Sequence, residues 1–184
     1  MGPQSSAQRK AALRAQTRSA RRALSDAQRA ARDRAVDAQA ARIAERFGPG
    51  DVVSSYVPTS LEPGSDRMLA AFADRGASVL VPVVVGVDAA LAWRHWPEEG
   101  QDAPPGALAE AAVVLVPALA VDRRGVRLGQ GGGHYDRSLA EAGPGAMLVA
   151  VVDDRELVDE LPCEPHDELL GWALTPKGLW RLGG

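Results

Sequence analysis

The sequence predicts an α/β fold: a three-layer, doubly wound, mostly parallel sheet with helices on both faces. Apolar runs at 52–57, 79–85, 113–121 and 147–152 lack polar alternation, which is typical of strands covered on both faces of a parallel sheet. Helical patterns alternate with these runs, as they do in doubly wound folds. The length of 184 residues suits one domain with a sizeable core.

Two helices are expected before the first strand. Residues 5–8 have the form of a capping box, with Ser at the cap and Gln three positions later, and the helix they begin should end near Arg22. Residues 25–28 repeat this signature and begin a second helix that should end near Phe47. On the second helix, apolar residues recur at spacings of four, three and four, so one face is apolar.

Shorter elements are expected later in the chain. The pattern predicts a short helix over 65–75, an edge strand over 91–96, a proline-rich loop over 97–106 and a last strand over 172–175. The helical pair at 1–47 needs further protein surface to cover its apolar faces. We therefore expect one domain over residues 1–184, with that pair packed on it.

Composition narrows the class of protein. The single Cys163 excludes an internal disulfide and fits a reducing compartment. No apolar run approaches the roughly 20 residues that span a bilayer, and no apolar segment follows the basic N-terminus as in a secretory signal. We expect a cytoplasmic monomer with no membrane partner.

Charge is divided unevenly along the chain. Residues 1–46 hold 11 Lys and Arg against 4 Asp and Glu, whereas residues 47–184 hold 10 against 20. The basic end can meet nucleic acid, supply cations to a phosphate site, or form a solvated helix face. Because residues 47–184 are acidic and the chain lacks a nucleic-acid-binding motif, we expect that nucleic acid is not a partner.

One stretch carries most of the functional information, Gly125 to Ser138, with the sequence GVRLGQGGGHYDRS between a predicted strand and a predicted short helix. Its five glycines permit unusual backbone conformations and close approach of a ligand. A glycine-rich turn opening a helix directs free N–H groups at one spot, where the dipole favours an anion. A tight connection alone does not explain three consecutive glycines between Arg127 and Arg137. The stretch predicts a phosphate-binding loop that is neither GxGxxG nor GxxxxGK[ST].

This stretch, with Asp122 before it, resembles the signature of the 5-formyltetrahydrofolate cyclo-ligase (methenyltetrahydrofolate synthetase) family. Three further matches extend the resemblance over nearly the whole chain: K-A-A-L-R at 10–14, Tyr56 followed by Glu62, and L-P-C-E-P-H-D at 161–167. Together with the glycine stretch, they come in the order in which the family has them. The resemblance implies conversion of 5-formyltetrahydrofolate and ATP to 5,10-methenyltetrahydrofolate, ADP and phosphate, with Mg²⁺. The substrate would be a small molecule, with or without a polyglutamate tail.

The resemblance also implies the residues that bind ATP. Lys10 and Arg14 would contact the phosphates, and their spacing of four places both on one face of the first helix. The glycine loop would surround the nucleotide and the reacting end of the folate, through Arg127, Leu128, Gly129, Gln130, Gly131, Gly132, Gly133, His134 and Tyr135.

Catalytic, metal and folate-binding roles follow from the same resemblance. Arg127, Tyr135 and Asp136 would be catalytic, and Asp136 and Asp167 would bind Mg²⁺. Glu62 would hold the pterin, whose adjacent N–H donors a carboxylate can accept in pairs. The folate-binding set would be Tyr56, Glu62, Gln130 and His134. Many relatives carry Tyr or Phe in place of His134, and some carry a basic or aromatic residue in place of Gln130.

Other interpretations remain open at this point. Lys10 and Arg14 also fit solvated helix charges, Glu62 fits a loop carboxylate, and Asp136 fits a residue that favours the helix dipole. The chain also fits an ATP-dependent ligase or kinase-like enzyme acting on another small carbonyl substrate. A third alternative is a folate- or nucleotide-binding module without catalysis. In the cyclo-ligase interpretation, we expect no serine or cysteine nucleophile, because phosphoryl transfer needs positioning and charge neutralisation.

Overall fold

A computed structural model describes residues 5–97, 101–164 and 167–183. The predicted loop at 97–106 and the C-terminal element at 161–167 lie partly outside these ranges. Seven strands form a central sheet: β1 (Val52–Ser54), β2 (Ser78–Val83), β3 (Ala92–Trp96), β4 (Ala111–Pro117), β7 (Met147–Val151), β9 (Trp172–Thr175) and β10 (Gly178–Arg181). Their order is β10-β9-β7-β4-β1-β2-β3. The five inner strands run parallel, and both edge strands pair antiparallel to their neighbours.

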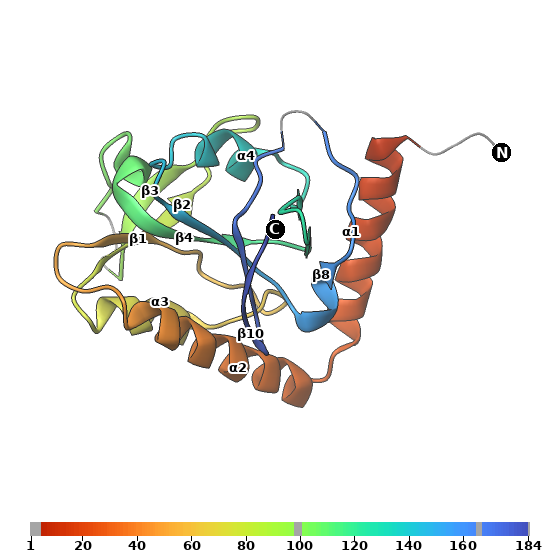
Figure 1. Ribbon diagram of the computed structural model, residues 1–184, viewed down its shortest axis with the longest axis horizontal. Coiled ribbons are helices and arrows are strands. Elements are labelled where there is room, and N and C mark those ends of the chain that lie inside the picture. The colour runs from red at the N-terminus through yellow and green to blue at the C-terminus, as the bar shows by residue number, and fades with distance from the viewer. Residues whose placement is uncertain (1–4, 98–100, 165–166, 184) are drawn as a thin grey trace.

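Helices cover both faces of this sheet, which confirms the predicted fold class (Figure 1). The helices α2 (Asp26–Ala44) and α3 (Asp66–Ala73) lie on one face, while the short α4 (His134–Leu139) and the 3₁₀ turn η1 (Ala107–Glu110) lie on the other. Strand β4 contributes to both layers. Its Val113 and Leu115 pack in the cluster under α2 and α3, and Val114 and Val116 pack in the opposite cluster. Alternate residues of one apolar strand therefore face two cores, as expected for a covered parallel sheet.

The two N-terminal helices begin where the capping boxes predict. In α1 (Ser6–Ala23), Ser5 Oγ accepts a hydrogen bond from the backbone N–H of Gln8, at 3.2 Å. At the start of α2, Ser25 Oγ accepts from the N–H of Gln28, at 3.3 Å. Both Gln side chains bond back to the cap N–H. Figure 1 shows α2 along the sheet and α1 standing beside the body of the molecule.

A second sheet of three strands was not predicted. It consists of β6 (Arg127–Leu128), β5 (Ala120–Asp122) and β8 (Leu157–Val158), in that order. The prediction of one strand over 113–121 is wrong, because Pro117 has no N–H to continue the ladder and β4 ends there. The chain then leaves the central sheet, and the N–H of Leu119 donates to the carbonyl of Leu128, at 2.8 Å.

Two strands differ from the sequence prediction. The first predicted strand, 52–57, is shorter in the structure and ends at Ser54, so Tyr56 and Val57 lie beyond the sheet. The final hairpin contains β10, which the sequence did not predict. Among the described residues, no helix has the length and apolar character that crossing a membrane requires.

Candidate active site

A cavity of about 480 Å³ lies where the carboxyl ends of β1, β2 and β4 meet. Tyr56, Pro82 and Pro117 line it from just beyond or at the ends of these three strands. From β1 the chain passes through α3 to β2, which pairs with one side of β1. Strand β4 pairs with the other side of β1, and from there the chain passes through α4 to β7. The strand order therefore reverses between β1 and β4. In open α/β sheets, ligands bind in the crevice at such a point.

The glycine stretch forms one wall of this cavity, which Gly129 to Gly133 all line. Gly131 has φ +108°, a conformation that side chains disfavour. At Gly129, a Cβ atom would lie 2.5 Å from Nη1 of Arg127, so only glycine lets the arginine side chain pass there. The stretch thus provides both a bare backbone and the space for one buried cation.

Arg127 is held from several directions. Its Nη2 donates to Oδ1 of Asp136 at 2.8 Å, and its Nη1 donates to the carbonyl of Pro117 at 3.5 Å. Its Cζ lies 5.6 Å from the centroid of the Tyr135 ring, a cation–π distance. The guanidinium is therefore fixed in place before any ligand binds.

Two polar groups beside this ion pair lack partners. The Nε of Arg127 and the hydroxyl of Tyr135 are both buried, and neither has a hydrogen-bond partner in the described part of the chain. Leaving a buried donor unpaired costs about 1–3 kcal/mol. Both residues line the cavity. An acceptor on a bound ligand would satisfy these donors.

Both tyrosines of the chain lie at this site as neutral phenols. Burial raises the pKa of Tyr135 above its ordinary range, although the nearby Arg127 opposes the shift. Burial, followed by the charge of Glu62, raises the pKa of Tyr56 as well. The hydroxyl of Tyr56 donates to the carbonyl of Pro63 at 2.7 Å. Tyr56 is thus anchored, whereas Tyr135 keeps a free donor.

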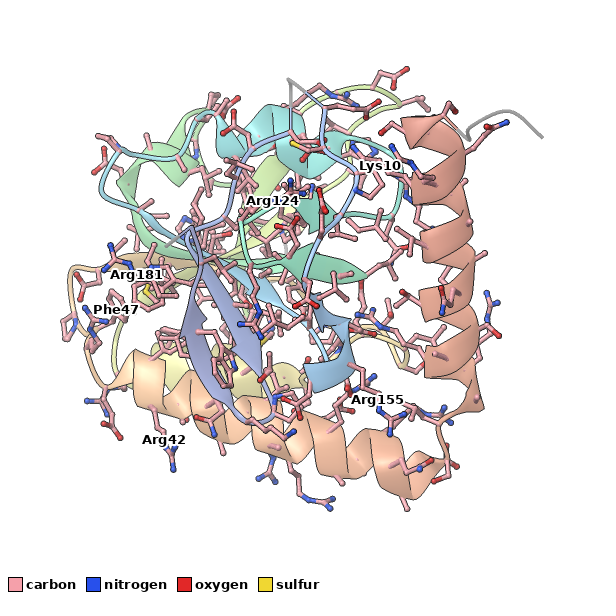
Figure 2. The ribbon with its side chains drawn as sticks, turned by 45° about the vertical axis from the view of Figure 1, so that its right-hand side comes forward. Lys10, Arg42, Phe47, Arg124, Arg155 and Arg181 are labelled. Atoms are coloured by element: carbon pink, nitrogen blue, oxygen red, sulfur yellow. The ribbon has the colours of Figure 1, made fainter. Side chains whose placement is uncertain are left out.

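Cations from α1 complete the wall that contains the glycine loop. Lys10 Nζ lies 2.8 Å from Oε2 of Glu164 and 2.8 Å from Oδ2 of Asp167, and Figure 2 shows Lys10 on the side of α1 that faces the molecule. Burial opposes its charge, but the hydrogen bonds to Asp167 and Glu164 prevail and raise the pKa of Lys10. Arg14 Nε donates to the carbonyl of Gly129, at 2.9 Å.

Arg18, one turn further along α1, was not predicted. Its Nη2 donates to Oε1 of Gln130 at 2.8 Å and to the carbonyl of the same residue at 2.9 Å. The spacing of four that links Lys10 and Arg14 continues to Arg18, so this periodicity was the signal that could have found it. A cation therefore lies beside Gln130, which itself carries no charge.

The opposite part of the cavity is more apolar. Val57, Pro82, Val84 and Leu91 line it together with Tyr56. Glu62 also lines the cavity, and its Oε2 accepts from the N–H and the hydroxyl of Thr59, both at 3.0 Å. The cavity thus combines a strongly charged wall with an apolar wall that holds one carboxylate.

The loop carrying Glu62 is fixed by α2, a relationship that sequence reasoning missed. Nη2 of Arg32 donates to the carbonyl of Glu62 at 2.8 Å. Asp37 accepts from the N–H of Ser65 at 2.9 Å and from its hydroxyl at 2.6 Å. These partners lie about 30 positions apart in sequence, with no motif linking them. Only the packing of α2 beside the loop brings them together.

Two residues of the glycine stretch differ from expectation in their contacts. The side chain of Leu128 packs in the core cluster of the small sheet and is not among the residues that line the cavity. His134 does line the cavity, but its Nδ1 lies 2.8 Å from the carbonyl of Ala89, so the ring holds the β2–β3 loop. The remaining predicted site residues all line this one cavity.

The two carboxylates expected to bind a metal ion are both ion-paired, Asp136 with Arg127 and Asp167 with Lys10. In residues 5–97, 101–164 and 167–183, no group of three or more His, Cys, Asp or Glu side chains is arranged to hold a metal ion. A metal at this cavity would therefore need ligands from a bound phosphate or from water. His166, part of the predicted C-terminal element, lies outside the described residues.

Comparisons with known proteins point to one family. The model of the 5-formyltetrahydrofolate cyclo-ligase family matches residues 6–176. A 5-formyltetrahydrofolate cyclo-ligase from Mycolicibacterium smegmatis is 44% identical over 145 residues, which cover 70% of this chain and 75% of that protein.

Two solved structures share the fold. A 5,10-methenyltetrahydrofolate synthetase from Mycoplasma pneumoniae superposes with a TM-score of 0.75 at 20% identity, covering 91% of this chain and 98% of that one. The Aquifex aeolicus 5,10-methenyltetrahydrofolate synthetase gives 0.70 at 22% identity, covering 95% and 93%. By the extent of the family match and the identity to its curated relative, the chain belongs to the 5-formyltetrahydrofolate cyclo-ligase family.

Proposed function

We propose that the protein catalyses the ATP- and Mg²⁺-dependent cyclisation of 5-formyltetrahydrofolate to 5,10-methenyltetrahydrofolate, with release of ADP and phosphate. One observation carries the proposal. In a member of this family, a single cavity brings the glycine loop and the α1 cations against the segment that holds Tyr56 and Glu62. A triphosphate and a pterin can therefore meet in one place.

ATP binds along the charged wall in this proposal. The bare backbone of Gly129 to Gly133 offers N–H groups to the phosphates, and Lys10 and Arg14 neutralise them. The raised pKa of Lys10 keeps its ammonium charged at neutral pH. When the triphosphate enters, Lys10 exchanges part of its contact with Glu164 and Asp167 for phosphate oxygens.

The folate occupies the other wall. The carboxylate of Glu62 accepts the paired N–H donors of the pterin. Tyr56 provides an apolar ring that its bond to Pro63 holds in place. Gln130 and His134, which also line the cavity, contact the formyl end of the substrate.

The chemistry has two steps. The formyl oxygen attacks the γ-phosphorus of ATP, so an O–P bond forms and the bond to ADP breaks. N10 then attacks the formyl carbon, the C–O bond breaks, phosphate leaves and N10 loses its proton. Phosphoryl transfer of this kind depends on positioning and on stabilising negative charge. Arg127 supplies the stabilising positive charge from a fixed position, and the neutral Tyr135 hydroxyl donates to an oxygen of the reacting group.

Asp136 and Asp167 are the residues that would hold Mg²⁺. The ion is usually bound by one or two carboxylates plus substrate phosphates and water, which fits two carboxylates on one cavity. A carboxylate has about four lone-pair positions, so an existing ion pair leaves room for a cation. When bound, Mg²⁺ neutralises charge on the transferring phosphate.

A product balance tests this function. The purified protein with 5-formyltetrahydrofolate, ATP and Mg²⁺ should form ADP and 5,10-methenyltetrahydrofolate in equal amounts, and no ADP without the folate. ADP formed only with some other small carbonyl compound would support a related ATP-dependent enzyme. Tight binding of ATP or folate without any turnover would identify a non-catalytic module.

A further inference from the structure

The helix α1 is held to the molecule by its charged side chains. Among its residues only Lys10 and Arg21 are buried, and Leu13 is its apolar contact with a core cluster. Helices usually dock through an apolar stripe, and most of their stability in proteins comes from that packing. The position of α1 therefore depends on a few polar contacts.

Three of its cations lie on one stripe. Arg21 follows Arg14 by seven residues and Lys10 by eleven, which is close to two and three full turns at about 3.6 residues per turn. Lys10 and Arg14 line the cavity, but Arg21 does not. A contact that fixes Arg21 consequently fixes the direction in which the other two cations project.

Arg21 makes such a contact with Glu156, in the 3₁₀ turn η2 (Asp154–Glu156). Its Nε donates to Oε1 and its Nη2 to Oε2, both at 2.7 Å, and Nη2 also donates to the carbonyl of Ala118 at 2.6 Å. Side-chain exposure is 3% for Arg21 and 10% for Glu156. Burial opposes the charge, but the hydrogen bonds and charge of Glu156 outweigh it and raise the pKa of Arg21. A two-point pair of this kind fixes orientation as well as distance.

The groups that receive Arg21 are themselves rigidly placed. Oε2 of Glu156 also accepts from the N–H of Asp153 at 2.7 Å, within the capping box of η2. Ala118 directly follows Pro117, whose carbonyl accepts from Arg127. The anchor of α1 and the central cation of the cavity are thus attached to the same short segment of chain.

We infer that Arg21 and Glu156 are positioning residues. They fix the rotation of α1 about its axis and its position along that axis, so that Lys10 and Arg14 reach the triphosphate of ATP. This inference rests on the proposed function. Neither residue lines the cavity. Buried ion pairs contribute little net stability compared with apolar residues, so placement of the helix is the property that this pair supplies.

Conservative variants test the inference. Arg21→Lys keeps the charge but loses the two-point contact, and Glu156→Gln keeps the shape but loses the charge. Each should raise KM for ATP on the order of tenfold to a hundredfold, as expected for a misplaced binding group. KM for 5-formyltetrahydrofolate should stay within twofold of the unmodified protein (about 0.4 kcal/mol). Arg22→Lys, at the adjacent exposed position, is the matched control and should change neither value.

Two further measurements separate positioning from loss of stability. In Arg21→Lys, the amides of α1 should exchange hydrogen faster than in the unmodified protein, whereas the amides of β4 should exchange at the same rate. Both results should hold in the presence and in the absence of substrates. Phe72→Leu, at a buried core residue of α3, should lower the melting temperature without changing KM for ATP. Unchanged α1 exchange, or equal increases in both KM values that track the melting temperature, would overturn the inference. Complete lack of turnover in the unmodified protein contradicts the proposed function instead, while α1 exchange still reports on the anchor.

Discussion

The guanidinium of Arg127 and the carboxylate of Asp136 form an ion pair of 2.8 Å across the turn that contains three consecutive glycines. The arginine side chain is buried, and the aspartate is partly exposed toward the cavity. Asp136 therefore fixes the cation that faces the reacting phosphate in the proposed function, in addition to its proposed role toward Mg²⁺. Preorganised charge of this kind lowers barriers because it needs no rearrangement during reaction.

Replacing Asp136 with Asn should lower kcat by about 10² to 10³, the usual effect of removing one preorganised electrostatic group. The variant should also need more Mg²⁺ for half-maximal activity, because a metal ligand has lost its charge. Steady-state rates over a Mg²⁺ titration test both points, with circular dichroism to show that the fold is retained. Near-normal activity at limiting Mg²⁺ would exclude a metal role for Asp136.

Replacing Gly129 with Ala should displace Arg127. The new Cβ would lie 2.5 Å from Nη1, so the guanidinium must shift, and we expect its ion pair with Asp136 to weaken. We expect kcat to fall about as far as in Arg127→Gln, on the order of a hundredfold. Gly145→Ala, where no heavy atom lies within 4 Å of the added Cβ, is the control and should retain full activity. Wild-type kcat in Gly129→Ala would show that Arg127 need not occupy this position.

Replacing Arg32 with Gln should weaken folate binding. Arg32 donates to the backbone carbonyls of Leu61 and Glu62, so its loss frees the loop that presents the Glu62 carboxylate. KM for 5-formyltetrahydrofolate should rise about tenfold, equivalent to about 1.4 kcal/mol, with KM for ATP unchanged. Arg42→Gln removes the same charge from α2 at a side chain that projects away from the body (Figure 2) and should have no effect. Parallel increases in both KM values would contradict a local role.

The two tyrosines predict the behaviour at high pH. Tyr56 and Tyr135 are the only tyrosines, and both have a raised pKa. A group with a raised pKa contributes its full stability below its unfolded pKa, about 10 for tyrosine, and loses it as pH rises toward the folded pKa. The free energy of unfolding should fall above about pH 10, and phenolate absorbance should appear only as the chain unfolds. Phenolate absorbance near pH 10 in folded protein would contradict the enclosed hydroxyls.

Local signals made much of the fold predictable. The starts of α1 and α2 follow from Ser and Gln three positions apart, and these contacts involve only neighbouring residues. The unalternating apolar strands indicated a covered parallel sheet. The small sheet was not predictable in this way, because β6 and β8 have two residues each and show no periodicity.

The candidate site could also be predicted only in part. Motif residues such as Lys10 and Gly131 could be singled out because each lies in a short contiguous motif, K-A-A-L-R at 10–14 and the glycine stretch at 125–138. The supporting contacts could not be predicted from the sequence, because Arg21 and Glu156 are separated by 135 positions and Arg32 contacts a loop 30 positions away. Nothing in the local pattern indicates such pairs, since only the folded chain brings them together.

The most direct measurement of the central claim is the near-ultraviolet absorbance of 5,10-methenyltetrahydrofolate during a reaction with 5-formyltetrahydrofolate, ATP and Mg²⁺. The unmodified protein should produce a steady rise that requires ATP, and Arg127→Gln should produce a rise about 10² slower. No absorbance change with the folded, unmodified protein would contradict cyclo-ligase activity. Equal rates in the two proteins would contradict the assignment of that activity to this cavity.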